Sequence, residues 1–458
     1  MSATLTLLRG NQGVRKPNVR PKSYRAYTQR DFDRIAPLSR ISAEQRFAMQ
    51  VVANVLPFRV NDYVIDELID WDRAPEDPIF QLTFPQPAML APAHFTRLAR
   101  LLRLDPSGSG LAEAVRAIRE QLNPHPAGQI EHNTPCLADG QPLFGLQHKY
   151  RETLLFFPSQ GQTCHAYCSF CFRWAQFIGD KALRIASHEA ELLHAYLRQH
   201  HQISDLLLTG GDPMVMKASH LAGYLEPLLR PEFAHVQNIR IGTKAISFWP
   251  YRFLTDPDSD ALLSLFERLT MAGKHLAIMA HLNHWRELET HAAQEAVARV
   301  RATGAEIRSQ SPLLARINDD PEVWARLWRT QVRLGIIPYY MFVERDTGAH
   351  RYFKVPLVRA WEIFRKAIRQ VSGLGRTARG PSMSAGPGKI EIQGVSRVDG
   401  EKVIVLRFLQ GRNPDWVNRP FFARYDKDAT WLDQLRPAFG ESRFFFQDEF
   451  EERWPGAA

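Results

Sequence analysis

Three cysteines stand close together in the chain at the spacing C-x3-C-x2-C: Cys164, Cys168 and Cys171. The chain has four cysteines in all, so three of them fall within eight residues. Thiolates this close together bind soft metals, and three are one fewer than a four-iron cluster needs. One iron is then left without a protein ligand and can bind a substrate or a cofactor. The spacing therefore predicts a catalytic iron–sulfur cluster.

Two other interpretations of these cysteines are open. A zinc knuckle usually needs a fourth Cys or His nearby, and the neighbour of a ligand, such as His165, can rarely reach the same metal. A disulfide would need an oxidising compartment, but the chain shows no export signal. Cys136, 28 residues upstream of Cys164, is expected to be an ordinary buried thiol.

The cysteines follow the first strand of a region that alternates between strands and helices. The pattern predicts strands at 152–157, 205–208, 238–241, 275–280, 306–309 and 336–342. It predicts helices at 187–200, 217–229, 258–272, 288–303, 321–334 and 356–371. Regular β-then-α alternation implies a parallel sheet, and right-handed crossovers would curl six units into an open partial (β/α)6 barrel. The carboxyl ends of the strands are the catalytic face of such barrels, so the cluster is expected there.

The expected fold class is α/β, and we divide the chain into four parts. They are a basic N-terminal arm (1–40), a helical N-terminal region (41–150), the partial barrel (151–375) and a small C-terminal β element with a tail (376–458). Strands are expected at 389–392 and 402–408 in the last part.

Composition places the chain among ordinary soluble proteins, with 45% hydrophobic and 23% charged residues. No apolar run approaches the roughly 20 residues of a membrane span, so we expect no membrane partner. The clustered cysteines and the missing export signal predict a location in the reducing cytoplasm. The net charge is +9, and part of it lies in the first thirty residues. Such an arm can bind nucleic acid, but it lacks interleaved aromatic residues, so nucleic acid is not the expected partner.

A second motif, Thr209-Gly-Gly-Asp212, ends the second predicted strand. Two glycines let the backbone approach a ligand closely, and the carboxylate of Asp212 could hold an ammonium group. Such a turn is weak alone, but its place after a three-cysteine loop favours a function.

With these motifs in order, the chain resembles the lysine 2,3-aminomutase family, which are radical S-adenosylmethionine (SAM) enzymes that also use pyridoxal phosphate (PLP). The likeness runs from about residue 45 to 410. Besides the two motifs above, the matching stretches are 145–150, Arg173, 239–243, 281–284, 310–314, 318–319, 338–340 and 386–389.

The resemblance implies conversion of an α-amino acid, lysine or a relative of it, into a β-amino acid through a 5′-deoxyadenosyl radical and a PLP imine. The implied cofactors are a [4Fe-4S] cluster, SAM and PLP. Gly210, Gly211 and Asp212, with His281 and Gln310, would contact SAM. Implied partners are a small-molecule amino acid, an electron donor such as flavodoxin or ferredoxin, and further copies of the chain in a homo-oligomer.

The same resemblance assigns the PLP and substrate residues. Lys389 would be the catalytic lysine that carries PLP, and Lys149 would contact the PLP phosphate. Arg173 would clamp the substrate carboxylate, and Asp319 would bind a distal cationic group, although Asp is also favoured at helix N-caps.

The chain departs from the family pattern at several positions. The glycine run before Lys389 is shortened and contains Pro387, and the acid that the family has before this run is missing from residues 381–385. Where the family has two phosphate-binding arginines, this chain has Lys149 and Thr153, and the family's zinc-binding C-terminal cysteines are absent. Two other functions therefore stay open: a radical SAM enzyme that acts without PLP on another small molecule or peptide, and a non-catalytic iron–sulfur or nucleic-acid-binding protein.

Overall fold

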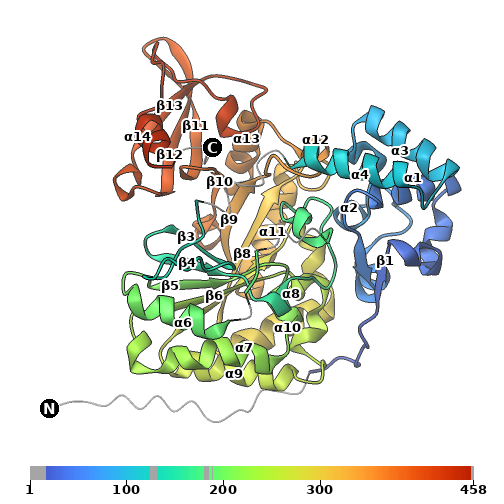
Figure 1. Cartoon of the computed structure of the whole chain (residues 1–458), viewed down its shortest axis with the longest axis horizontal. Helices are drawn as coiled ribbons and strands as arrows, with labels where there is room; N and C mark the ends of the chain where they lie inside the picture. Colours follow the sequence, from blue (N-terminus) through green and yellow to red (C-terminus); the bar gives the residue numbers. More distant parts are fainter. Residues whose placement is uncertain (1–16, 124–131, 180–184, 188, 455–458) are drawn as a thin grey trace.

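The computed structural model describes residues 17–123, 132–179, 185–187 and 189–454. One large sheet dominates it, with the strand order β13-β12-β11-β10-β9-β8-β7-β6-β5-β4-β3, and β1 and β2 form a separate pair. Figure 1 shows the large sheet running from the C-terminal strands at the top to the strands below, with the N-terminal helices to one side.

Six parallel strands form the centre of the large sheet. They are β4 (Thr153–Phe156), β5 (Asp205–Leu208), β6 (Asn238–Thr243), β7 (His275–His281), β8 (Glu306–Leu313) and β9 (Ile337–Val343). Each pairs in parallel with the next along the chain. The predicted α/β class is thus confirmed, while the curvature of a partial barrel stays a prediction.

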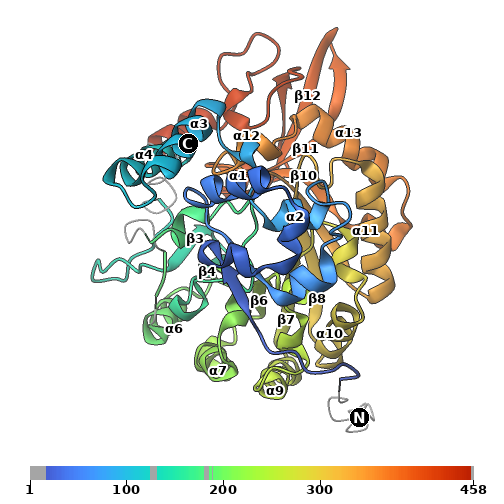
Figure 2. The same ribbon diagram turned by 90° about the vertical axis from the view of Figure 1, so that its right-hand side faces the viewer.

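Helices connect the parallel strands. They are α6 (Ala190–Gln199), α7 (Ala218–Leu225), α8 (Ala245–Phe248), α9 (Ser259–Met271), α10 (His291–Ala302), α11 (Pro321–Leu334), α12 (His350–Phe353) and α13 (Leu357–Ile368). Figure 2 shows α6, α7, α9, α10 and α11 following one another in an arc around the strands.

Local sequence explains how these elements begin, end and pack. The N-cap of helix α11 is Asp320, whose side chain accepts a hydrogen bond from the Glu322 N–H. Pro321 occupies the first turn of the helix. It ends at Gly335, whose φ of 76° suits glycine. Strand β8 alternates between partly exposed and buried residues, so one of its faces joins the hydrophobic core and the other carries polar side chains.

Both edges of the sheet extend beyond the prediction. Strand β3 (Leu146–Tyr150) pairs antiparallel with β4, and β10 (Arg379–Ser384) pairs in parallel with β9, so seven strands rather than six run in parallel. The antiparallel strands β11 (Gly388–Val398), β12 (Glu401–Gly411) and β13 (Pro420–Arg424) complete the sheet. A second hydrophobic core, which includes Phe408 and Trp416, lies under these strands and α14 (Gln447–Arg453).

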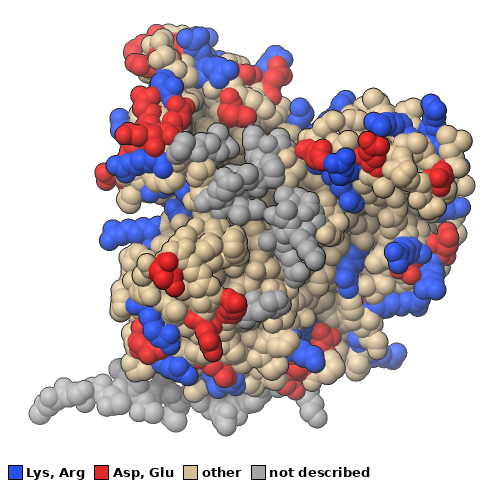
Figure 3. Space-filling view, in the orientation of Figure 1, with Lys and Arg blue, Asp and Glu red and all other residues tan. Residues whose placement is uncertain are grey.

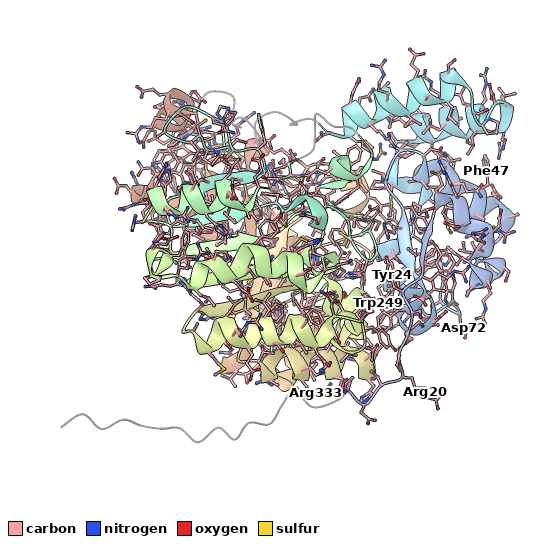
Figure 4. The ribbon with its side chains drawn as sticks, turned by 60° about the horizontal axis from the view of Figure 1, so that its bottom comes forward. Arg20, Tyr24, Phe47, Asp72, Trp249 and Arg333 are labelled. Atoms are coloured by element: carbon pink, nitrogen blue, oxygen red, sulfur yellow. The ribbon has the colours of Figure 1, made fainter. Side chains whose placement is uncertain are left out.

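The N-terminal region consists of short helices and a strand pair. Its elements are β1 (Ala26–Thr28), α1 (Ala43–Ala53), β2 (Arg59–Asn61), α2 (Pro78–Thr83), α3 (Pro92–Leu104) and α4 (Ser109–Leu122). The described part of the basic arm is packed against this region, because β1 pairs with β2 and Phe32 and Leu38 are buried. In Figure 4 the labelled Tyr24 and Trp249 lie side by side, and their ring centroids are 5.0 Å apart. The division into four parts otherwise stays a prediction.

The surface carries both signs of charge. On the face seen in Figure 3, basic and acidic side chains are interspersed. Within the described ranges, no helix combines the length and apolar character needed to cross a bilayer.

Candidate active site

The three cysteines lie in a loop that follows β4 and the short turn Ser159–Gly161. The N–H of Cys171 donates a hydrogen bond to the carbonyl of Cys168 (3.1 Å), which folds the loop back on itself. Burial raises the pKa of all three thiols, well above the usual range for Cys164 and to about 12 for Cys168. Thiolates in this position need a compensating cation, and an iron–sulfur cluster supplies one. The donor set therefore fits a cluster.

The arrangement of the side chains does not fit a single metal ion. In the part of the chain that the structure describes, no three His, Cys, Asp or Glu side chains could hold one ion together. A zinc ion needs thiolates about 2.3 Å from one point, whereas each thiolate of a [4Fe-4S] cluster binds a different iron atom. The choice of a cluster over zinc stays a prediction. Cys136 is exposed, so the prediction of a buried thiol there is wrong.

The Gly-Gly-Asp turn lies directly against the cysteine loop. The N–H of Asp212 donates to the carbonyls of Gly161 (3.0 Å) and Thr163 (2.6 Å). A Cβ on Gly211 would lie 2.4 Å from the Thr163 carbonyl oxygen, so only glycine fits there. Glycine at position 211 thus allows a close contact with the protein's own backbone at Thr163. The sequence did not indicate this role.

The carboxylate of Asp212 is buried and already accepts several hydrogen bonds. Its donors are the N–H of Met214 (2.9 Å), the hydroxyl of Thr243 (2.6 Å) and the N–H of Lys244 (2.9 Å). Burial raises the pKa of this carboxyl group. Because a carboxylate has about four acceptor positions, one remains, and contact with the SAM ammonium group stays a prediction.

A buried ion pair beside the cysteine loop was missed by sequence reasoning. The ammonium group of Lys244 lies 2.5 Å from Glu287, which is fully buried, and donates to Asn283 (3.0 Å). The same lysine and glutamate act electrostatically on the thiol of Cys168. No motif marks this pair, because the two residues are 43 positions apart.

Arg173 extends from the end of the cysteine loop to the Gly-Gly-Asp turn. Its guanidinium donates to the hydroxyl of Thr209 (3.3 Å) and the carbonyl of Gly210 (3.0 Å), and lies 4.6 Å from the Phe157 ring centroid. Burial lowers its pKa to about 10. Its contact with a substrate carboxylate stays a prediction.

A row of residues across the sheet connects the cysteine loop with Lys389. The ring of Phe170, in the loop, contacts the edge of His281 (5.5 Å between centroids). His281 on β7 pairs with Gln310 on β8, which pairs with Tyr340 on β9. The ammonium nitrogen of Lys389 lies 4.3 Å from the Tyr340 ring centroid. The predicted cluster, SAM and PLP residues therefore lie on one connected surface.

His281 has a polar atom that the described part of the protein leaves unused. The Nε2 atom of His281 is buried and has no hydrogen-bond partner in the described structure, and burial lowers the pKa of this histidine well below its usual range. A neutral imidazole with an open nitrogen is suited to a hydrogen bond with a ligand. The roles of His281 and Gln310 with SAM stay predictions.

Lys389 is the first partly exposed residue of β11, after the buried Gly388. Burial, together with the nearby cations Arg240 and Arg379, lowers its pKa to about 7. Tyr340 and Phe342 face the amine with their rings (4.3 and 5.6 Å). A lysine with such a pKa is neutral often enough at pH 7 to attack a carbonyl carbon, as a PLP-carrying lysine must.

Two cations hold the shortened glycine run in front of Lys389. The ammonium group of Lys149 donates to the Ala385 carbonyl (2.5 Å), and Arg412 donates to the Gly386 carbonyl (3.0 Å). Burial lowers the pKa of both side chains. The nearby cations Arg412, Arg345 and Lys389 also contribute to lowering the pKa of Lys149. A phosphate would relieve this repulsion, so the residues present fit the anionic end of PLP.

Asp319 is not brought to this surface in the way the other predicted residues are. It is exposed, and its carboxylate accepts a hydrogen bond from the N–H of Arg316 (3.1 Å) in the turn before α11. The alternative that Asp319 caps the helix is wrong, because the N-cap is Asp320, while the contact of Asp319 with a substrate cation stays a prediction.

Comparison with known proteins adds to this geometry. No family model matches the chain. It is 32% identical over 405 residues to a putative L-lysine 2,3-aminomutase of Aquifex aeolicus, covering 88% of this chain and 94% of that protein. It is 24% identical over 298 residues to the L-lysine 2,3-aminomutase of Methanococcus maripaludis, covering 65% of each. A crystal structure of Streptococcus suis SuiB bound to S-adenosylmethionine aligns with 61% of this chain and 58% of its own, at 14% identity and a TM-score of 0.34, which is too slight a likeness to establish a shared fold.

The Aquifex relative is matched over nearly its whole length at more than 30% identity. From this match, the chain belongs to the L-lysine 2,3-aminomutase family.

Proposed function

We propose that the protein is a radical SAM aminomutase that moves the amino group of an α-amino acid from C2 to C3 and so forms a β-amino acid. The observation that carries this proposal is the amine of Lys389, which is buried, has a pKa lowered to about 7, and lies on the same surface as the cysteine loop. The family and the names of its members support the reaction type.

The chemistry would come from three bound groups. Cys164, Cys168 and Cys171 would hold a [4Fe-4S] cluster, and an electron carrier such as flavodoxin or ferredoxin would reduce it. The cluster and SAM would together supply a carbon-centred radical at C5′ of deoxyadenosine. PLP would supply the carbonyl carbon that holds the migrating nitrogen.

The protein's own residues would bind and orient these groups. Lys389 would hold PLP covalently until the substrate amine displaces it, and Lys149 with Arg412 would face the phosphate. Arg173 would clamp the α-carboxylate through two parallel hydrogen bonds. The rings of Tyr340 and Phe342 lie against the amine and would keep water away from the reacting atoms.

The test uses the full chain, purified without oxygen and reconstituted with iron and sulfide. Reduction with borohydride after PLP addition should place one pyridoxyl group on Lys389, which peptide mass analysis detects. Adding SAM, a reductant and a panel of amino acids should yield 5′-deoxyadenosine and a β-amino acid. Lys389→Arg should lose the pyridoxyl adduct and the β-amino acid but keep the cluster, whereas Cys168→Ala should lose the cluster.

Two results would contradict the proposal in different ways. Production of 5′-deoxyadenosine with no PLP adduct would favour a radical SAM enzyme that acts on another small molecule or a peptide. Failure to form a cluster, together with salt-sensitive binding to RNA or DNA, would favour a non-catalytic protein.

A further inference from the structure

The surface around the predicted PLP site carries more positive charge than the cofactor alone would balance. The pKa of Lys149 is lowered by burial and then by three cations: Arg412, Arg345 and Lys389. Arg173 contributes a further charge, because its guanidinium carbon lies 5.2 Å from the same Phe172 ring centroid as that of Arg345. A phosphate ester brings about two negative charges, and a substrate α-carboxylate brings one.

The carboxylates close to Lys389 are already paired with arginines. The carboxylate of Asp205 acts to raise the pKa of Lys389. It forms two contacts with Arg240 (2.7 and 2.8 Å). Glu391, two residues after Lys389 on β11, lies 2.8 Å from Arg407.

Two other acids are unsuited to hold a buried ammonium group. Glu344, at the end of β9, lies 3.1 Å from His350, and burial raises its pKa to about 7, so much of it is protonated at neutral pH. Asp319 is exposed in its turn. None of these four acids, Asp205, Glu391, Glu344 and Asp319, is thus suited to hold the distal ammonium group of lysine.

Arg345 is placed to meet a second carboxylate of the substrate. The guanidinium carbons of Arg173 and Arg345 each lie 5.2 Å from the ring centroid of Phe172, so they are no further apart than twice that distance. Asp346 acts on Arg345, but burial outweighs it and the pKa of Arg345 remains lowered. Two buried guanidinium groups beside one ring match a molecule with a carboxylate at each end.

Ser382 supplies an independent observation. Its side chain is fully buried, and its hydroxyl has no hydrogen-bond partner in the described structure. In the strand register Ser382 pairs with Glu391 and Ser384 pairs with Lys389, so the hydroxyl of Ser382 lies on the same face of the sheet as Lys389. A buried hydroxyl without a partner is costly, and a bound substrate would satisfy it.

We propose that the substrate is an acidic α-amino acid, whose α-carboxylate contacts Arg173 and whose side-chain carboxylate contacts Arg345 and the hydroxyl of Ser382. This inference rests on the proposed function and names its substrate class. In the reaction, the C2–N bond breaks and a C3–N bond forms, while one hydrogen moves from C3 to C2, so no net oxidant or reductant is consumed. For aspartate this shift returns aspartate, whereas for glutamate it gives 3-aminopentanedioate. Glutamate is therefore the productive substrate.

The test compares glutamate with glutamine, which has the same shape but no side-chain charge. The anaerobic holoenzyme with cluster, PLP and SAM is given glutamate, glutamine, lysine or arginine, and β-amino products are measured by mass. We expect kcat/KM for glutamate to exceed that for glutamine by at least about 10-fold, since hydrogen bonds between charged groups are the stronger kind. A second measurement, the change in PLP absorbance on adding each amino acid without reductant, reports binding independently of turnover.

Variants of Arg345 test the contact directly. Arg345→Met should lower kcat/KM for glutamate by about 10- to 100-fold and leave glutamate and glutamine nearly equal, whereas Arg345→Lys should retain part of the preference. Arg326→Met, a change to an arginine that pairs with Glu289 on the surface, is the matched control and should leave the preference intact. Ser382→Ala, which removes a hydroxyl without a partner, should weaken glutamate binding while thermal stability stays the same or rises.

The outcomes separate this inference from the proposed function. If PLP is trapped on Lys389 and 5′-deoxyadenosine forms, but lysine, arginine or glutamine is isomerised as well as glutamate, only the acidic-substrate proposal is overturned. An unchanged glutamate preference in folded Arg345→Met would also overturn it. If neither the PLP adduct nor 5′-deoxyadenosine forms with any amino acid, the proposed function is wrong, and the acidic-substrate proposal, which rests on it, is wrong as well.

Discussion

At the scale of single residues, the amine of Lys389 differs from that of an ordinary surface lysine in its protonation. A lysine in water has a pKa of about 10.4, so at pH 7 almost every molecule is charged and unreactive. Burial, with Arg240 and Arg379 nearby, lowers the pKa of Lys389 to about 7. The neutral amine is the form that attacks a carbonyl carbon, so the surroundings prepare this residue for PLP.

The expected consequence is a pH dependence of PLP attachment. Because deprotonation activates the amine, the rate of adduct formation with PLP should rise as the pH increases through about 7 and then level off. Stopped-flow absorbance on the anaerobic protein measures this rate, and Lys389→Arg is the control for PLP bound elsewhere. A rate that continues to climb towards pH 10 would show that the pKa is not lowered.

The sequence predicted the site best where the functional residues are close together in the chain. The three cysteines and the Gly-Gly-Asp turn lie within short stretches, and the structure brings them together. Arg345 and Arg412 were missed because they act on Lys149 from 196 and 263 positions away in the sequence. Nothing local distinguishes them from surface arginines until the sheet places them side by side.

At the scale of elements, the fit between the Gly-Gly-Asp turn and the cysteine loop fixes the position of the predicted cluster. The two segments touch through backbone atoms at Gly211 and Thr163, with no room for a side chain between them. Any enlargement of Gly211 must therefore push the cysteine loop away from the strand end.

Gly211→Ala should destabilise the protein by about 1–3 kcal/mol, as other overpacking changes do, and reduce the iron bound per chain. Thermal unfolding and iron analysis after reconstitution measure the two effects. Gly223→Ala is the matched control, because its added methyl group meets nothing within 4 Å and it lies inside α7, where alanine favours the helix. Equal iron content in the two variants would refute the role given to this contact.

The strands were predicted best where hydrophobic residues run without interruption. Strand β5 (Asp205–Leu208) was predicted at its observed bounds, because three leucines end it. Strand β10 was missed because Gly380 and Pro381 are typical of turns, and its pairing with β9 is irregular between Arg379 and Ser382. Its place in the sheet follows from long-range packing, which no local pattern records.

At the scale of the whole molecule, the N-terminal region covers the cysteine loop. Asn61 is fully buried, and its amide donates to the carbonyls of His165 (3.2 Å) and Phe248 (2.8 Å), so one side chain joins the N-terminal region, the loop and α8. Tyr24 adds a hydrogen bond to the same carbonyl of His165 (2.7 Å).

Asn61→Ala removes the donor to the buried Phe248 carbonyl and leaves only Tyr24 as donor to that of His165, so it should cost about 1–3 kcal/mol of stability. It should also expose the cluster, so that its visible absorbance decays faster in air than in the unchanged protein. Asn54→Ala, which removes a single hydrogen bond to Gln50 at the end of α1, is the control. A decay rate equal to that of the control would show that the N-terminal region does not shield the cluster.

The hydrogen bond from Lys149 to Ala385 spans 236 positions of the sequence. While the polypeptide is being made, the ribosome must therefore add most of the remaining chain before the acceptor for this lysine exists. Local contacts in the strands and helices can form during synthesis, but this one cannot. The anion-binding end of the active site is thus among the last parts of the protein to be assembled, and its formation marks a nearly finished chain.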